Sequence, residues 1–328
     1  MPRQRNKAKE KCLPTTIAKH NSTGGLLTTH MKPGSSIAFI TAVFGDYEKS
    51  LKEPALQQGA TAKFIAFCDE PFAKAWLSMH GYTSRGWTKA ASSNKQTAAV
   101  PGSSWHLDWK PYHSQYVDLN NTKGPTPSWT HFTKMFKVAK WYKTQFFRIP
   151  RLRRFDRIVW MDATIALCDP QCARFATNGA HSLTSVHFHP RNCSVLEELR
   201  HSTDGPKYFA QPMVQQVASY LKEGQPERYG LWLTCFNIHD MTNMATESFL
   251  NTWYTQTGKW SLQDQLSFPY AAWKHQSSNF SVASLLESDY QKRGWSPGDY
   301  RGMPCAFVKI PHALRATVPA NKCQNMLL

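Results

Sequence analysis

The sequence predicts an α/β fold in which a mostly parallel central sheet is flanked by helices. Two apolar runs, at residues 37–44 and 63–68, end abruptly at polar residues, as buried strands do where they enter loops. A third such run covers residues 157–161. Polar and helical-looking segments separate the runs, and this alternation is typical of parallel strands joined by crossover helices.

Apolar residues at helical spacing predict the helices of the fold. A basic amphipathic helix is expected from about Thr133 to Phe147, ended by Pro150. Further helices are expected at residues 213–223, 244–256 and 264–274.

Length and composition favour a folded protein with one main domain. The chain has 328 residues, of which 41% are hydrophobic, enough to bury a sizeable core and to exclude a disordered protein. Its net charge of +17 suits an anionic partner such as nucleic acid, a lipid surface or a diphosphate. We expect residues 1–34 to form a flexible basic arm and residues 35–328 to form a single domain.

The sequence also carries signals that bear on the cellular compartment. No apolar run approaches the ~20 residues of a membrane span, and the N-terminus lacks the apolar stretch of a signal peptide. We therefore expect a cytoplasmic or otherwise soluble protein. The eight cysteines form no zinc-binding pattern, and mostly reduced thiols are expected. Without a secretion signal, we expect the four Asn-x-Ser/Thr sequons to be chance matches, at Asn21, Asn120, Asn192 and Asn279.

Acidic residues follow the predicted strands, at Asp46, Asp69 and Asp162. The carboxyl ends of parallel strands form the ligand crevice of open α/β sheets. Asp162 follows the most hydrophobic strand, where a carboxylate can hold Mg²⁺ or Mn²⁺ bound to a diphosphate. The alternative is that Asp162 caps a turn, and Thr164 stands where an Asp-x-Asp motif has its second acid.

The basic helix has lysines at three-residue spacing, at Lys134, Lys137 and Lys140. One of these ammonium groups could neutralise a departing diphosphate, and we select Lys137 for this role. The alternative is a solvated helix face.

Two more segments contain candidate residues for binding a sugar. His189 and Arg191 can hydrogen-bond sugar hydroxyls or phosphate, whereas a metal site there lacks a third ligand at a diagnostic spacing. Asp264 stands between Gln263 and Gln265 and could deprotonate an acceptor hydroxyl while the amides hold sugar hydroxyls. The alternative role for Asp264 is a helix N-cap.

Eight short segments occur in a fixed order between residues 37 and 275. They are residues 41–47, 67–70, 86–87, 136–137, 160–163, 189–191 with 197–198, 220–226 and 264–268. In this order they resemble the DUF616 family, whose plant members include mucilage-related glycosyltransferases.

The resemblance implies a GT-A-like fold and a glycosyltransferase, hexosyl or pentosyl, that uses Mn²⁺ or Mg²⁺. It implies a UDP-sugar donor whose nucleotide lies beside the first segment and near Asp69. The donor-side residues of that segment are Thr41, Ala42, Phe44, Gly45 and Tyr47. Asp162 would hold the metal and the diphosphate, and Asp264 would act on the acceptor side. The chain differs from the plant relatives in lacking their membrane anchor and in having Thr164.

Other functions stay open beside a transferase with a nucleotide-sugar donor and a glycan acceptor. A pI of about 9.6, with aromatic residues among the basic ones, also suits a nucleic-acid-binding protein. The sequence has no RNP1-like, zinc-finger or KH pattern, so no nucleic acid is expected. A ceramidase-type hydrolase is a weaker alternative because a Gly-x-Ser-x-Gly elbow and a zinc triad are missing.

Overall fold

The structure of the protein is a computed structural model. It describes residues 36–45, 51–52, 62–81, 96–99, 103–117, 131–167, 171–178, 181–187, 193–204, 208, 210–277, 279–284, 299–300 and 307–309. The arm predicted at residues 1–34 lies outside these ranges.

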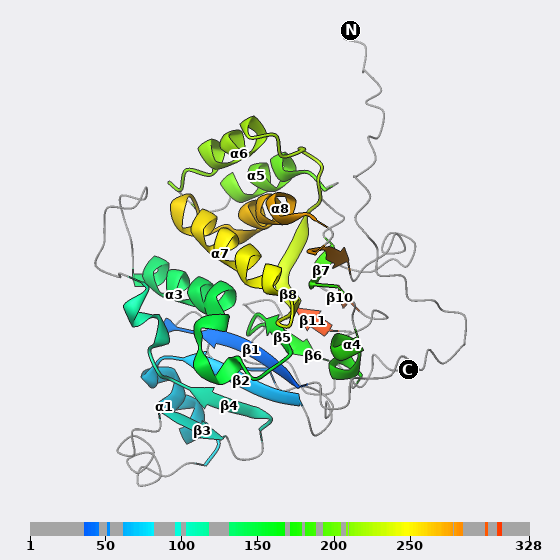
Figure 1. Cartoon of the computed structure of the whole chain (residues 1–328). Helices are drawn as coiled ribbons and strands as arrows, with labels where there is room; N and C mark the ends of the chain where they lie inside the picture. Colours follow the sequence, from blue (N-terminus) through cyan, green and yellow to red (C-terminus); the bar gives the residue numbers. More distant parts are fainter. Residues whose placement is uncertain are drawn as a thin grey trace.

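A mixed eight-stranded sheet forms the centre of the fold (Figure 1). Its strand order is β3-β4-β2-β1-β5-β8-β7-β9. Strands β4, β2, β1 and β5 run parallel, and so do β7 and β9, whereas β8 is antiparallel to both of its neighbours and β3 is antiparallel to β4. The strands are β1 Ile37–Val43, β2 Ala62–Cys68, β3 Thr97–Ala99, β4 Trp105–Asp108, β5 Arg157–Met161, β7 Leu183–His187, β8 Trp232–Asp240 and β9 Val282–Ser284.

A small antiparallel sheet lies beside the large one. Its strand order is β10-β11-β6. Its strands are β6 Ile165–Leu167, β10 Asp299–Tyr300 and β11 Phe307–Lys309.

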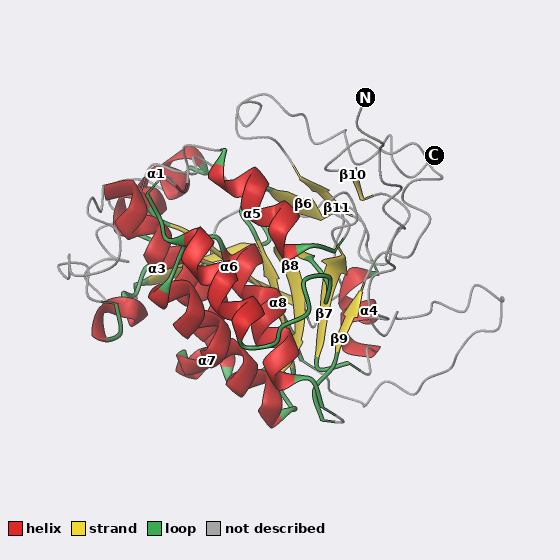
Figure 2. Ribbon diagram, turned by 90° about the horizontal axis from the view of Figure 1, so that it is seen from above, coloured by secondary structure: helices red, strands yellow, loops and turns green. Residues whose placement is uncertain are grey.

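Helices cover both faces of the large sheet (Figure 2). Side chains of α1 and α4 share one core with one face of the sheet. On the other face, α3, α7 and α8 share a second core with the strands, and α5 and α6 pack against α8 from outside. The helices are α1 Glu70–Met79, α3 His131–Gln145, α4 Cys172–Asn178, α5 Val195–Thr203, α6 Met213–Lys222, α7 Met244–Lys259 and α8 Asp264–His275, with 3₁₀ turns η2 Tyr112–Gln115, η3 Phe146–Arg148 and η4 Pro150–Leu152.

The α/β class and the mostly parallel sheet flanked by helices are as the sequence predicted. The three predicted strands are β1, β2 and β5, which are adjacent and parallel. Both faces of these strands are covered by helices, which explains why their sequences are almost continuously apolar. The predicted helices correspond to α3, α6, α7 and α8, but α3 ends earlier, at Gln145, and Pro150 begins a 3₁₀ turn instead of ending the helix.

A bulge in β8 reshapes the middle of the sheet. Ser185 of β7 pairs with Asn237 of β8, whereas the next β7 residue pairs with Leu233, so residues 234–236 have no partner in β7. Asn237 is fully buried and holds this bulge together. Its side-chain oxygen Oδ1 accepts a hydrogen bond from the Ser185 hydroxyl at 2.6 Å, and its side-chain nitrogen Nδ2 donates to the backbone carbonyl of Thr234 at 2.9 Å. Bulges often re-aim a side chain beside an active site.

The cysteines correct one expectation from the sequence. Cys172 and Cys193 each take part in a disulfide bond, whereas Cys68 and Cys235 are thiols. The prediction of mostly reduced thiols is therefore wrong for two of the four cysteines in the described ranges. The prediction assumed that a large core makes disulfides unnecessary, but the redox state of the compartment also decides whether they form.

In the described part of the chain, no helix combines the length and the apolar character that crossing a bilayer requires.

The bulge makes a testable contribution to stability. Replacement of Asn237 by Ala should lower the free energy of unfolding by about 1–3 kcal/mol, because it removes the amide donor to the buried Thr234 carbonyl and the shortest of the hydrogen bonds of the Ser185 hydroxyl. Urea titration measures this loss. The exposed Gln215→Ala on α6 serves as control and should stay within about 0.5 kcal/mol of wild type. Equal stability of the two variants would contradict this role of Asn237.

Candidate functional site

The strand order places a topological switch point between β1 and β5. From β1 the chain continues to β2 and β4 on one side, and it then returns to β5 on the other side. Open α/β sheets bind ligands at the carboxyl ends of strands at such a point. Asp162 is the first residue after β5 and therefore lies at this switch point.

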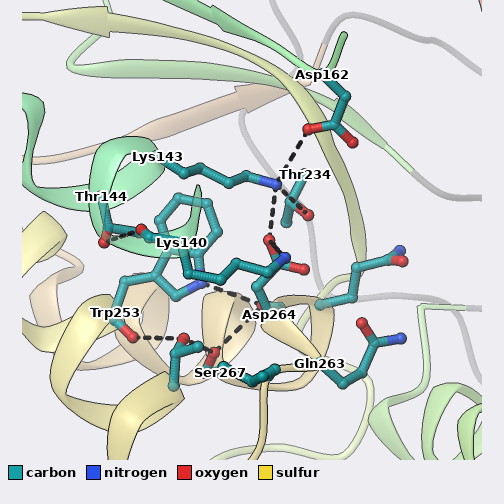
Figure 3. A network of polar contacts seen from close by, with 12 residues as sticks. Lys140, Lys143, Thr144, Asp162, Thr234, Trp253, Gln263, Asp264 and Ser267 are labelled. Atoms are coloured by element: carbon teal, nitrogen blue, oxygen red, sulfur yellow. Dashed lines mark hydrogen bonds and ion pairs between the residues drawn. The ribbon is translucent and has the colours of Figure 1, made fainter. Parts of the chain in front are cut away.

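Asp162 presents a carboxylate with one occupied oxygen. Its side chain is 37% exposed. The indole N–H of Trp160 donates to Oδ1 at 2.9 Å, and Nζ of Lys143 lies 3.7 Å from the same oxygen. The other oxygen, Oδ2, has no protein partner among the described residues (Figure 3). The carboxylate is thus oriented by one oxygen and available through the other.

A buried cluster of charges lies next to Asp162 (Figure 3). Oδ2 of Asp264 lies 2.7 Å from Nζ of Lys140 and 2.7 Å from Nζ of Lys143. The Lys143 ammonium also donates to Oγ1 of Thr234 at 3.1 Å. Asp264 is the first residue of α8, both lysines come from α3, and Thr234 comes from the bulge of β8.

Lys143 has a third N–H donor besides those directed at Asp264 and Thr234. An ammonium group has three N–H donors, and Asp264 and Thr234 accept two of them. The distance of 3.7 Å to Asp162 is longer than the roughly 2.7–2.9 Å of a charge-assisted hydrogen bond. Lys143 therefore keeps donor capacity on the side of the exposed carboxylate.

Two indole rings flank the same ammonium. Nζ of Lys143 lies 5.7 Å from the ring centre of Trp160 and 5.6 Å from that of Trp253. Trp253 also donates its indole N–H to the backbone carbonyl of Asp264 at 3.1 Å. The two rings shield the ammonium from water, and the ammonium is attracted to the π-electron faces of the rings.

The electrostatics of the cluster favour the charged forms of its members. Burial alone would raise the pKa of Asp264, but Lys140 and Lys143 outweigh it and hold that pKa well below its ordinary value. Burial alone would lower the pKa of Lys143, but Asp162 and Asp264 outweigh it and raise that pKa. A carboxylate with a lowered pKa is a weak base. Asp264 is thus suited to holding the two lysines, and not to the role of general base that the sequence suggested.

The amides beside Asp264 also differ from expectation. Gln263 was predicted to bind sugar hydroxyls, but it is buried and its amide donates to Glu198 at 2.6 Å and to Ser202 at 2.8 Å. Gln265 is half-buried, and its amide donates to the Trp232 carbonyl at 3.2 Å. Both amides hold the start of α8 against neighbouring elements. The N-cap alternative also fails for Asp264, because the cap position is Gln263.

The first predicted segment lies at the end of β1, beside the switch point. Asp69 caps α1 by accepting from the N–H of Phe72 at 3.0 Å, and it also accepts from the N–H of Gly45 at 2.5 Å. Gly45 has a φ of 65°, in the left-handed region that favours glycine. Asp69 therefore ties the loop after β1 to the start of α1.

The other described residues of that segment are mainly structural. Thr41 is buried within β1, and Ala42 is half-buried against the core. The Phe44 ring is buried and stacks on Tyr142 at 5.0 Å. Tyr47, His189 and Arg191 lie outside the described residues.

The charge cluster contains two lysines of α3 other than Lys137, which the sequence suggested for the diphosphate. Lys137 is half-buried, whereas Lys140 and Lys143 are the lysines that contact Asp264. Lys143 was missed, although it extends the series of Lys134, Lys137 and Lys140 by one more step of three. A helix turns about 100° per residue, so each such step falls about 60° short of a full turn. The four lysines consequently point in successively rotated directions around the helix axis, and the sequence does not show which of them face the sheet.

The protein groups at the switch point fit a hard divalent cation shared with a ligand. Mg²⁺ commonly binds one or two carboxylates and completes its shell with substrate phosphates and water. Oδ2 of Asp162 offers one such ligand. Thr164 is buried in the turn that follows, so it does not supply a second exposed ligand. Within the described ranges, no three His, Cys, Asp or Glu side chains gather as a metal cage.

Comparison with protein-family models and with curated protein sequences finds no match for this chain. Solved structures of glycosyltransferases are similar to it at low sequence identity. The bifunctional glycosyltransferase WbbM is 12% identical over 76% of this chain, with a TM-score of 0.41. This chain spans only 38% of the length of that protein.

Two other solved structures match larger shares of their own chains. Mouse xyloside xylosyltransferase 1 is 9% identical, with 79% of this chain and 90% of that one covered and a TM-score of 0.40. Core-mannan synthase A from Aspergillus fumigatus, solved in a form with Mn and GDP, is 11% identical, with 73% and 70% covered and a TM-score of 0.40.

The charge cluster predicts a large effect of one substitution. Asp264→Asn leaves two buried ammonium groups without their carboxylate, and the free energy of unfolding should fall by about 3–5 kcal/mol. The triple variant Lys140→Met, Lys143→Met, Asp264→Leu removes every charge and should recover most of this loss. Chemical denaturation measures both effects, with the exposed Asp204→Asn as control. A neutral Asp264→Asn would contradict the buried cluster.

The same cluster predicts the direction of the pH dependence. Because the folded-state pKa of Asp264 is lowered, its contribution is complete above the unfolded-state pKa of about 3.9 and is lost as the pH falls toward the folded value. Wild-type stability should therefore drop below about pH 4 more steeply than that of Asp264→Asn. Parallel slopes for the two proteins between pH 5 and pH 2, roughly the range in which such a carboxylate titrates, would contradict the assignment.

Proposed function

We propose that the chain is a metal-assisted glycosyltransferase of the GT-A-like kind. It would transfer a sugar from a nucleoside-diphosphate-sugar donor to a glycan hydroxyl. One observation carries this proposal. At the switch point of the sheet, Asp162 has an exposed carboxylate oxygen, and the Lys143 ammonium lies 3.7 Å from the other oxygen of the same carboxylate. The resemblance to the DUF616 family supports the same reaction.

The chemistry requires charge stabilisation on the leaving group. Transfer breaks the anomeric C–O bond through an oxocarbenium-like state, and negative charge develops on the departing diphosphate. Preorganised donors that face this charge lower the barrier. Lys143 meets the requirement because Asp264, Thr234 and two indole rings fix its ammonium in place.

Asp162 would hold the divalent cation through Oδ2, and Mn²⁺ or Mg²⁺ there would supply Lewis-acid stabilisation of the diphosphate. The indole N–H of Trp160 fixes the orientation of the carboxylate. In this arrangement Lys140 and Asp264 are positioning residues, because they act by holding Lys143.

The burial of the lysines favours a small diphosphate over a nucleic acid. Lys140 and Lys143 have side chains that are only 8% and 3% exposed. Contacts to a nucleic-acid backbone need basic side chains that extended phosphates can reach from the surface. Asp264 is buried and paired with both lysines, so we do not propose it as the acceptor base.

The metal and donor roles are tested with Asp162→Asn. Wild-type protein should gain thermal stability from UDP or GDP with Mn²⁺, since a ligand at about 100 times its Kd adds about 2.7 kcal/mol. The variant should stay folded without ligand, because Asp264 still neutralises Lys143, and should lose this gain. Asp204→Asn, also exposed, should keep it. A full gain in Asp162→Asn, or none in wild type, would overturn the proposal.

The role of Lys143 is tested by turnover. Lys143→Met should slow hydrolysis of the best-binding sugar nucleotide by about 10²–10³-fold, the usual cost of removing one donor to a developing anion. The exposed Lys222→Met should leave the rate unchanged. Thermal melting of both variants separates a loss of folding from a loss of rate. A folded Lys143→Met with normal turnover would show that this ammonium does not face the leaving group.

A further inference from the structure

The turn between α8 and β9 contains an Asn-x-Ser sequon, Asn279-Phe280-Ser281. Such a sequon is a glycan acceptor when it lies on a surface loop of a secreted protein and its middle residue is not Pro. Asn279 is exposed, whereas Phe280 is buried and stacks on Phe249 at 5.0 Å. The sequon is therefore anchored to the core by its middle residue and presents its asparagine at the surface.

The backbone of the turn is held on both sides of this asparagine. The Asn279 carbonyl accepts hydrogen bonds from the Ser182 hydroxyl at 3.3 Å and from the Asn243 amide at 2.6 Å. Its N–H donates to the Ser277 hydroxyl at 3.2 Å. Because backbone groups make these bonds, they do not depend on an unmodified Asn279 side chain.

The disulfides provide a second, independent observation. Cys172 and Cys193 are disulfide-bonded. Disulfides form and persist in oxidising compartments such as the endoplasmic reticulum lumen and are rare in the cytosol. Asparagine-linked glycosylation marks proteins of the same secretory route. The oxidised cysteines therefore speak against the expectation that the sequons are chance matches, which rested on the lack of a signal peptide.

The turn lies at the opposite end of α8 from the charge cluster. Asp264 begins α8 and the turn follows the end of that helix at His275, so roughly 17 Å of helix separates the turn from the charge cluster. The next element, β9, is the edge strand of the large sheet. An edge strand presents unpaired backbone groups to other chains. A glycan on Asn279 would be attached three residues before this edge strand, at the other end of α8 from the charge cluster.

We propose that Asn279 is an N-glycosylation site and that the protein matures in an oxidising secretory compartment. The Asn279 amide nitrogen forms a bond to the anomeric carbon of an oligosaccharide carried on a lipid diphosphate. The anomeric C–O bond breaks, the lipid diphosphate leaves with its electron pair, and the amide nitrogen loses one proton. Of the four sequons, this is the one that lies within the described residues.

The experiment uses the full chain, directed by an added leader into the secretory pathway of cultured animal cells. Peptide mass spectrometry of the wild-type protein should find Asn279 carrying a glycan that N-glycosidase F removes, converting the residue to Asp. Asn279→Gln and Ser281→Ala should each lose one glycan, whereas Ser281→Thr keeps the sequon and should keep the glycan. The wild-type measurement does not depend on the folding of any variant.

Two results would overturn the proposal. One is secreted, folded wild-type protein in which most Asn279 is unmodified. The other is alkylation of Cys172 and Cys193 without prior reduction, which would show that these cysteines are thiols in the mature protein. A normal thermal melt of Asn279→Gln, together with loss of one glycan, would show that the modification and the fold are separable. Neither outcome depends on transferase activity.

Discussion

The carboxylate of Asp264 is the constraint on which the arrangement of the site depends. It neutralises two lysines of α3 from the first residue of α8, and one of those lysines reaches the bulge of β8 and the residue after β5. Four segments that are distant in sequence thereby meet at one small group of charges. Each buried charge is costly alone and tolerable only with its partners, so these segments must meet in one particular geometry.

The surrounding structure gives this geometry its rigidity. The bulge that presents Thr234 is closed by the buried pair Ser185 and Asn237. The start of α8 is held by Gln263, whose amide is bonded to Glu198 and Ser202 of α5. A buried ion cluster adds little net stability compared with apolar residues of similar volume. Its presence beside an exposed carboxylate therefore fits a site that fixes a cation in place for a ligand.

The glycan and the charge cluster occupy opposite ends of α8. Asp264 lies at the amino end of the helix, beside the switch point, and the sequon follows its carboxyl end, beside the edge strand. The helix consequently separates the end at the proposed reaction site from the end that presents Asn279 at the surface. The oxidised state of Cys172 and Cys193 agrees with the proposed maturation outside the cytosol.

The sequence by itself determined the strands β1, β2 and β5, the helices α3, α6, α7 and α8, and the place of Asp162 after a buried strand. Each of these follows from local hydrophobic periodicity, which a chain displays without its partners. Only the tertiary structure decided that Lys140 and Lys143 contact Asp264, that Asp264 is the counter-ion of both, and that a bulge presents Thr234. Burial and charge pairing set the protonation and role of a side chain, and both arise from contacts between residues about 90–120 positions apart along the chain.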